Sequence, residues 1–84
     1  MSIRIKVTSG SDGTVFKVDG RLRSEDVEEL ARVFRPVQGA TSLDLTELQS
    51  ADHEGLEILR ELVARGAEVR GASPYIELLL KTKS

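Results

Sequence analysis

The chain has 84 residues and a net charge of −2, with 39% hydrophobic residues, 31% charged residues and no cysteine. This length and composition predict a single globular domain over residues 1–84, and the missing cysteine excludes disulfides, thiolate metal sites and cysteine nucleophiles. The charges are scattered and lack the basic stripe of a nucleic-acid-binding protein, and no window approaches the roughly 18 apolar residues of a membrane span.

The N-terminal segment predicts a β-hairpin. Ile3, Ile5 and Val7 alternate with polar residues, which is the period-two pattern of a half-buried strand. A turn rich in Gly and Ser at 9–13 leads to a second β-rich run at 14–19. This start lacks the apolar block of a signal peptide, so we expect a cytoplasmic protein.

A first helix is predicted between residues 24 and 35. Ser24 is a candidate N-cap, because its hydroxyl can accept from the free N–H groups of the first turn. The apolar positions that follow recur at helical spacing, and Pro36 ends the helix. These apolar positions are Val27, Leu30, Ala31 and Phe34.

A third strand is predicted at 41–46, followed by a loop from Gln49 to Gly55 and a helix from about His53 to Arg65. Gly66 suits the position after this helix because it tolerates a positive φ. The predicted apolar face of the helix consists of Leu56, Leu59, Leu62 and Val63, with Ile58 on its flank.

A short fourth strand is predicted at 67–70, and Ser73 and Pro74 have the N-cap and first-residue pattern of a last helix. The element order is therefore β-β-α-β-α-β-α. Strand–helix–strand units predict parallel pairing, and the opening hairpin adds an antiparallel strand. The expected fold is a small α/β sandwich with a four-stranded mixed sheet and three main helices.

The junction before the second helix is the best candidate for a functional site. In open α/β sheets, ligands and partners tend to meet the loops at the carboxyl ends of the strands. Asp52 can cap the helix by accepting from N–H groups two and three residues later. His53 and Glu54 follow in the first turn, where the positive end of the helix dipole favours negative charge.

Short motifs recur along the chain in a characteristic order. The matching residues are Gly20, Leu22, Leu43-Asp44-Leu45, Asp52, Gly55, Leu56, Gly66 and Ser73-Pro74. From about Val15 to Leu80, this pattern resembles the STAS domain of bacterial anti-sigma factor antagonists. The resemblance implies a small STAS-like sandwich that acts through protein–protein interaction.

The chain departs from the family pattern at positions that matter for regulation. In regulated STAS domains, the residue after the signature Asp is a Ser or Thr that a partner kinase phosphorylates, but here it is His53, followed by Glu54. The acidic residue that often ends the upstream G-x-L-D segment is replaced by Arg23, with Arg21 before Leu22. The resemblance therefore implies a member without the serine switch, whose interaction is constitutive or controlled elsewhere.

The resemblance also implies where a partner binds and what it is. The partner would be an anti-sigma factor or a related regulatory ATPase. Two alternatives remain open: a cytoplasmic accessory subunit of an ABC-type phospholipid transporter, and a small-ligand domain that senses nucleotides or lipids. The sequence does not specify the oligomeric state. The candidate partner-binding residues are Arg21, Arg23, Asp52, His53, Glu54, Gly55 and Leu56.

Several of these residues have more than one interpretation. Glu54 is either an ordinary first-turn acid or a partial mimic of a phosphoserine. Arg21 and Arg23 either pair with Asp52 or Glu54, offer a cationic surface to an acidic partner, or form a solvated rim. His53 is expected to be an exposed first-turn residue, with a phosphohistidine relay as the less favoured interpretation.

No catalytic, metal or cofactor site is predicted. His53 is the only histidine, so it cannot build a histidine-based metal site, and the chain has no G-x-S-x-G elbow, P-loop or G-x-G-x-x-G motif. One Tyr and two Phe give little surface for stacking on nucleic-acid bases. We therefore expect no enzyme activity, cofactor, metal, nucleic-acid partner or membrane insertion.

Overall fold

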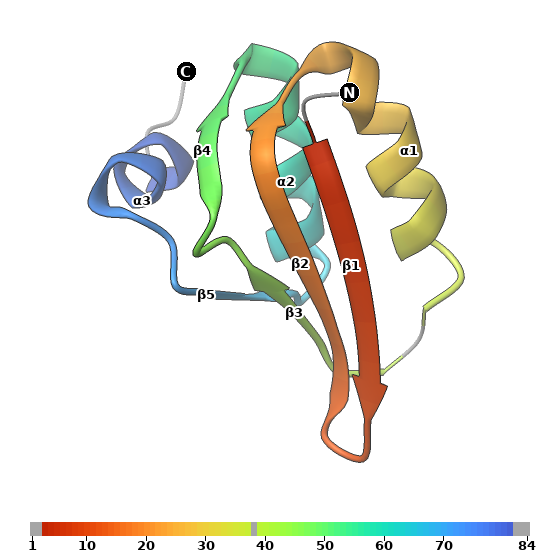
Figure 1. The fold of residues 1–84 in the computed structure, drawn as a ribbon. Helices are drawn as coiled ribbons and strands as arrows, with labels where there is room; N and C mark the ends of the chain where they lie inside the picture. Colours follow the sequence, from red (N-terminus) through yellow and green to blue (C-terminus); the bar gives the residue numbers. More distant parts are fainter. Residues whose placement is uncertain (1–2, 38, 82–84) are drawn as a thin grey trace.

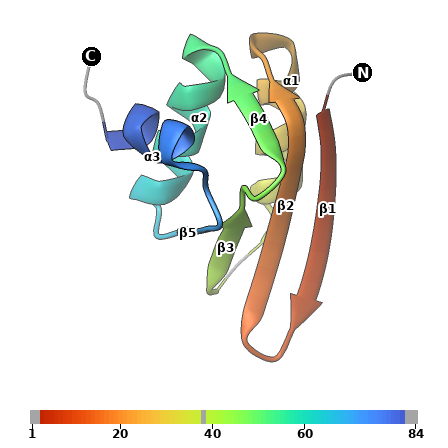
Figure 2. The same cartoon turned by 60° about the vertical axis from the view of Figure 1, so that its left-hand side comes forward.

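A mixed sheet with helices against one face forms the fold (Figure 1). The computed structural model describes residues 3–37 and 39–81. Figure 2 shows α1 and α2 on the same side of the sheet, with α3 beside α2. In chain order, the elements are β1 (Ile3–Gly10), β2 (Gly13–Leu22), α1 (Ser24–Phe34), β3 (Thr41–Asp44), β4 (Leu48–Ala51), α2 (His53–Ala64), β5 (Glu68–Arg70) and α3 (Pro74–Lys81).

The long strand β2 organises the sheet. β1 pairs with it in the antiparallel direction, from Ile3 opposite Gly20 to Gly10 opposite Gly13. On its other side β2 pairs in parallel with β3 and then with β4, and β3 pairs in parallel with β5. The chain returns for these parallel pairs through α1 and α2, so the predicted mixed sheet with helical crossovers is confirmed.

The sheet has five strands within residues 3–37 and 39–81, so the prediction of four strands was wrong. The third strand ends at Asp44, and residues 48–51, which were predicted as loop from Gln49, form β4. The strand breaks because Asp44 Oδ1 accepts hydrogen bonds from the Thr46 N–H at 3.0 Å and the Thr46 hydroxyl at 2.6 Å. Both bonds lower the pKa of Asp44 below its ordinary value, and the bond from the Thr46 hydroxyl has the larger effect. Strand pairing with β2 then resumes with Leu48 opposite Gly20, and the register shifts between Gly20 and Arg21.

The hydrophobic core lies between the inner face of the sheet and the helices. The rings of Phe16 on β2 and Phe34 on α1 have centroids 4.9 Å apart, which joins these two layers. The predicted face of α2 needs one correction, because Ile58 is buried and Val63 is 40% exposed. The buried apolar residues are Ile3, Phe16, Val18, Leu22, Leu30, Phe34, Leu43, Leu45, Leu48, Ile58, Leu59, Leu62, Ala67 and Ile76.

The helix ends confirm some of the predicted caps. The Ser73 hydroxyl accepts from the Ile76 N–H at 3.2 Å, and Gly66 after α2 has φ of +107°. The predicted Ser24 cap was wrong, because Ser24 is already the first residue of α1 and Arg23 occupies the cap position. No helix in the described ranges is long and apolar enough to span a membrane.

Candidate functional site

One carboxylate joins the starts of two helices. Asp52 follows β4 directly and occupies the N-cap position of α2 with an extended backbone. Its Oδ1 accepts from the Gly55 N–H at 2.8 Å, as the sequence predicted for a cap. Its Oδ2 accepts from the Ser24 N–H, also at 2.8 Å, although Ser24 lies 28 residues earlier. Asp52 therefore holds the first turns of both α1 and α2.

These hydrogen bonds stabilise the ionised form of Asp52. The bond from the Gly55 N–H lowers the pKa of the carboxyl most, followed by the bond from the Ser24 N–H. The positive charge of Arg23 lowers it further. The Asp52 carboxylate is therefore ionised and bound to backbone donors at neutral pH.

Gly55 allows α2 to lie close to β2. A Cβ at this position would lie 2.7 Å from the Leu22 carbonyl oxygen, which is shorter than real side chains tolerate. The same carbonyl accepts a hydrogen bond from the Asp52 N–H at 3.0 Å, so it is fixed in place. Glycine is needed here for space, which explains its place in the motif.

The first turn of α2 presents polar side chains to solvent. His53 and Glu54 are both exposed, while Leu56 is half-buried. His53 Nε2 lies 3.5 Å from Glu57 Oε1, one turn further along the helix. Position 53 therefore carries a solvent-facing imidazole.

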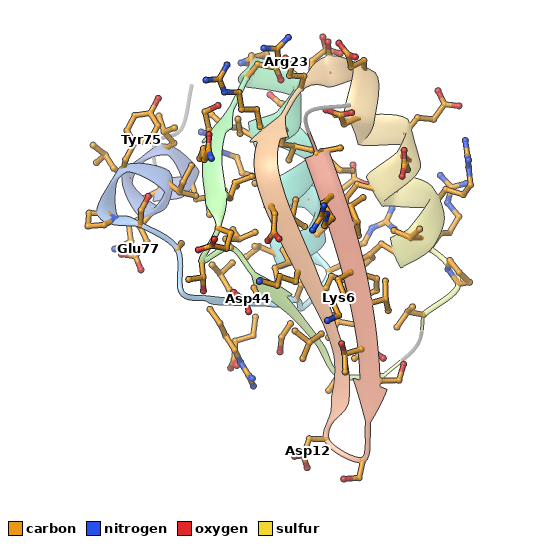
Figure 3. The ribbon with its side chains drawn as sticks, viewed as in Figure 1. Lys6, Asp12, Arg23, Asp44, Tyr75 and Glu77 are labelled. Atoms are coloured by element: carbon orange, nitrogen blue, oxygen red, sulfur yellow. The ribbon has the colours of Figure 1, made fainter. Side chains whose placement is uncertain are left out.

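An open hollow of about 510 Å³ lies where β2 and β4 end. Arg21 and Arg23 line it together with Gln49, Ser50 and Asp52. Figure 3 shows Arg23 at this end of the sheet, far from the hairpin tip that carries Asp12. The structure therefore brings both predicted arginines next to Asp52, while residues 53–56 continue from it along α2.

Arg23 lies in this group without a direct ion pair. Among the described residues, the salt bridges include neither Arg23 nor Glu54, so the interpretation in which these two pair is not supported. Arg23 acts on Asp52 through space, since its charge contributes to the lowered pKa of that carboxyl. The guanidinium group of Arg23 is exposed.

Three contributors to the site were not predicted. Ser24 supplies a backbone N–H to Asp52, and Gln49 and Ser50 line the hollow. No local pattern signals these roles, because each depends on how β4 and α1 meet in space. Within residues 3–37 and 39–81, no three His, Asp or Glu side chains gather as metal ligands.

Two solved structures share this arrangement of helices and strands. The first is the crystal structure of an anti-sigma factor antagonist STAS domain from Rhodobacter sphaeroides, with a TM-score of 0.64 and 22% sequence identity. The match covers 86% of this chain and 92% of that chain. The chain has the STAS fold.

A second solved structure has a similar fold. It is an uncharacterised protein with a SpoIIAA-like fold from Shewanella loihica, with a TM-score of 0.60 and 19% identity, over 92% of this chain and 72% of that chain. No family model and no curated protein matches the sequence. The STAS fold confirms the small α/β sandwich expected from the motifs.

Proposed function

We propose that this chain is a protein–protein interaction module of the anti-sigma factor antagonist type. It binds an anti-sigma factor or a related regulatory ATPase in the cytoplasm, and this binding releases the protein that its partner holds captive. The binding surface, here called the partner edge, consists of Arg21, Arg23 and residues 52–56.

The observation that carries this proposal is the pair of hydrogen bonds to Asp52. They fix the loop and the starts of α1 and α2 through bonds within the chain. The backbone that presents the exposed His53 and Glu54 side chains is therefore fixed, and such preorganisation reduces the entropic cost of association. The Rhodobacter sphaeroides protein with the same fold is itself named as an anti-sigma factor antagonist.

The same edge supports an interaction without a serine switch. A phosphoserine would add about 1.5 to 2 negative charges at neutral pH, and the first turn of a helix would partly stabilise them. Position 53 has an imidazole instead of a hydroxyl, and Glu54 contributes one permanent negative charge beside it. The interaction is therefore constitutive, or is controlled by another part of the molecule.

Affinity capture tests the proposed partner. The tagged chain is used to capture proteins from a lysate of its own source, and these are identified by mass spectrometry. Glu54→Arg reverses one exposed charge at the partner edge and is expected to reduce capture at least about tenfold, or 1.4 kcal/mol. Glu28→Arg, an exposed site on α1, is the matched control and should leave capture unchanged.

The identity of the captured protein decides between functions. An anti-sigma factor or kinase-like regulatory ATPase, lost with Glu54→Arg but kept with Glu28→Arg, supports the proposal. A transporter ATPase would favour the accessory-subunit alternative instead. Capture that is equal for wild type and Glu54→Arg, or no capture at all, contradicts an interaction through this edge.

The missing hydroxyl gives a second test. Incubation with ATP and the cognate anti-sigma kinase is expected to leave residues 52–55 unmodified, because no hydroxyl lies at position 53. His53→Ser is the positive control, since it restores the acceptor of the regulated family. Intact-mass measurement at neutral pH, which preserves phosphohistidine, reads both results. Phosphate on His53 of the wild-type chain would show that the switch is retained in another form.

A further inference from the structure

Two arginines lie at and just beyond the end of β2. Arg21 pairs with Ser50 of β4, and Arg23 follows the last residue of β2. Both are exposed, and both line the hollow of about 510 Å³. Two arginines are thus placed on a single open depression.

The two carboxylates near Arg23, those of Asp52 and Asp26, accept hydrogen bonds from backbone N–H groups. Asp52 uses one oxygen for the Gly55 N–H and the other for the Ser24 N–H. Asp26 is buried, and its Oδ2 accepts from the Arg23 N–H at 3.1 Å. Asp52 keeps one negative charge in the lining of the hollow, whereas Arg21 and Arg23 bring two positive charges, so these three residues leave the hollow with a net positive charge.

The chemistry of the hollow selects one kind of group. A cation would meet two like charges, and an apolar surface would bury guanidinium groups without compensation. A carboxylate accepts paired N–H bonds from a guanidinium in a planar arrangement, and the side chains of Gln49 and Ser50 offer further donors. We propose that an acidic side chain of the partner protein docks in this hollow, between Arg21 and Arg23.

This inference rests on the proposed function and names the partner chemistry that the edge accepts. It also separates the partner edge into two parts. Glu54 and the first turn of α2 form an acidic part, and the hollow at the ends of β2 and β4 forms a cationic part. A matching partner therefore presents a basic group to the helix and an acidic group to the sheet.

A blocked triglutamate peptide tests the hollow without knowledge of the partner. Its binding to the 84-residue chain is followed by amide NMR shifts at low ionic strength, with a trilysine peptide as the charge control. We expect the largest shifts at residues 21–23 and 49–52. Arg23→Gln is expected to weaken binding about two- to fivefold, in the range of an exposed ion pair.

Arg35→Gln is the matched control, because Arg35 is exposed at the other end of α1 and lines a different hollow. It should leave the affinity for triglutamate unchanged. Thermal melts of both variants confirm that neither has lost its fold. Shifts spread evenly over all exposed arginines, or equal effects of Arg23→Gln and Arg35→Gln, would overturn the inference.

Capture with Arg23→Glu separates this inference from the proposed function. If Glu54→Arg loses the partner while Arg23→Glu retains it, docking in the hollow is wrong and the interaction function stands. If the wild-type chain captures no partner, the interaction function fails, and the NMR titration alone decides whether the hollow selects a carboxylate.

Discussion

Replacement of Gly55 by alanine is expected to destabilise the protein by about 1–3 kcal/mol, the usual cost of forcing atoms into a packed site. Alanine normally stabilises a helix interior relative to glycine by about 1 kcal/mol, so the expected sign is opposite to that of helix propensity. The reason is steric, because the new Cβ would lie 2.7 Å from the Leu22 carbonyl oxygen and 3.0 Å from Leu22 Cγ. Urea unfolding at neutral pH measures the change.

Gly10→Ala is the matched control for this prediction. A Cβ at Gly10 meets nothing within 4 Å, and the residue lies at the exposed end of β1. Its free energy of unfolding should stay within about 0.5 kcal/mol of the wild-type value. If Gly55→Ala were as stable as Gly10→Ala, then α2 would not depend on this close approach to β2.

Replacement of Asp52 by alanine is expected to lower the free energy of unfolding by about 2 kcal/mol at neutral pH, the upper part of the range for a lost N-cap. The loss is at this end of the range because the carboxylate accepts from two helix starts, through Gly55 and Ser24. Asp52→Asn keeps one acceptor oxygen and should lose about half as much. Asp12→Ala, at the exposed hairpin tip, removes the same charge and should be nearly neutral.

The pH dependence gives this prediction a second test. The pKa of Asp52 is lowered in the folded protein, so its contribution is complete above the ordinary carboxyl pKa of about 3.9. This contribution of Asp52 to the free energy of unfolding is lost as the pH falls through its lowered pKa in the folded protein. The difference in stability between wild type and Asp52→Ala should therefore be constant from pH 7 to about 5 and shrink below about pH 4. A constant difference down to pH 3 would show that ionisation of Asp52 is not the cause.

Local patterns predicted most of the elements but missed the break in the third strand. Leu43 and Leu45 alternate with Asp44 as in any half-buried strand, and both are buried. The turn that separates β3 from β4 depends on the Asp44 side chain reaching Thr46, and β4 itself has a weak strand pattern, with Gln49 and Ser50 in its centre. The pairing partner β2 stabilises this segment, and that partner is distant in the sequence.

The candidate site shows the same division between local and distant effects. The cap from Asp52 to Gly55 spans three residues, so helix-capping rules predicted it. The bond from Ser24 to Asp52 spans 28 residues, and it replaces the local cap that Ser24 was expected to form. The likeness in motifs placed Arg21 and Arg23 near Asp52, but only the fold shows that they line one hollow.

The central place of β2 has a consequence for the order in which the chain folds. Its pairing with β1 closes a short turn, from Gly10 to Gly13, and hairpins of this kind form within about 1–10 μs. Its pairing with β3 joins Thr14 to Thr41, so a much longer segment that includes α1 must be brought together first. We expect the hairpin to form early and to serve as the template on which β3 and β4 assemble. Among the described strands β5 pairs with β3 alone, and we expect it to join the sheet last.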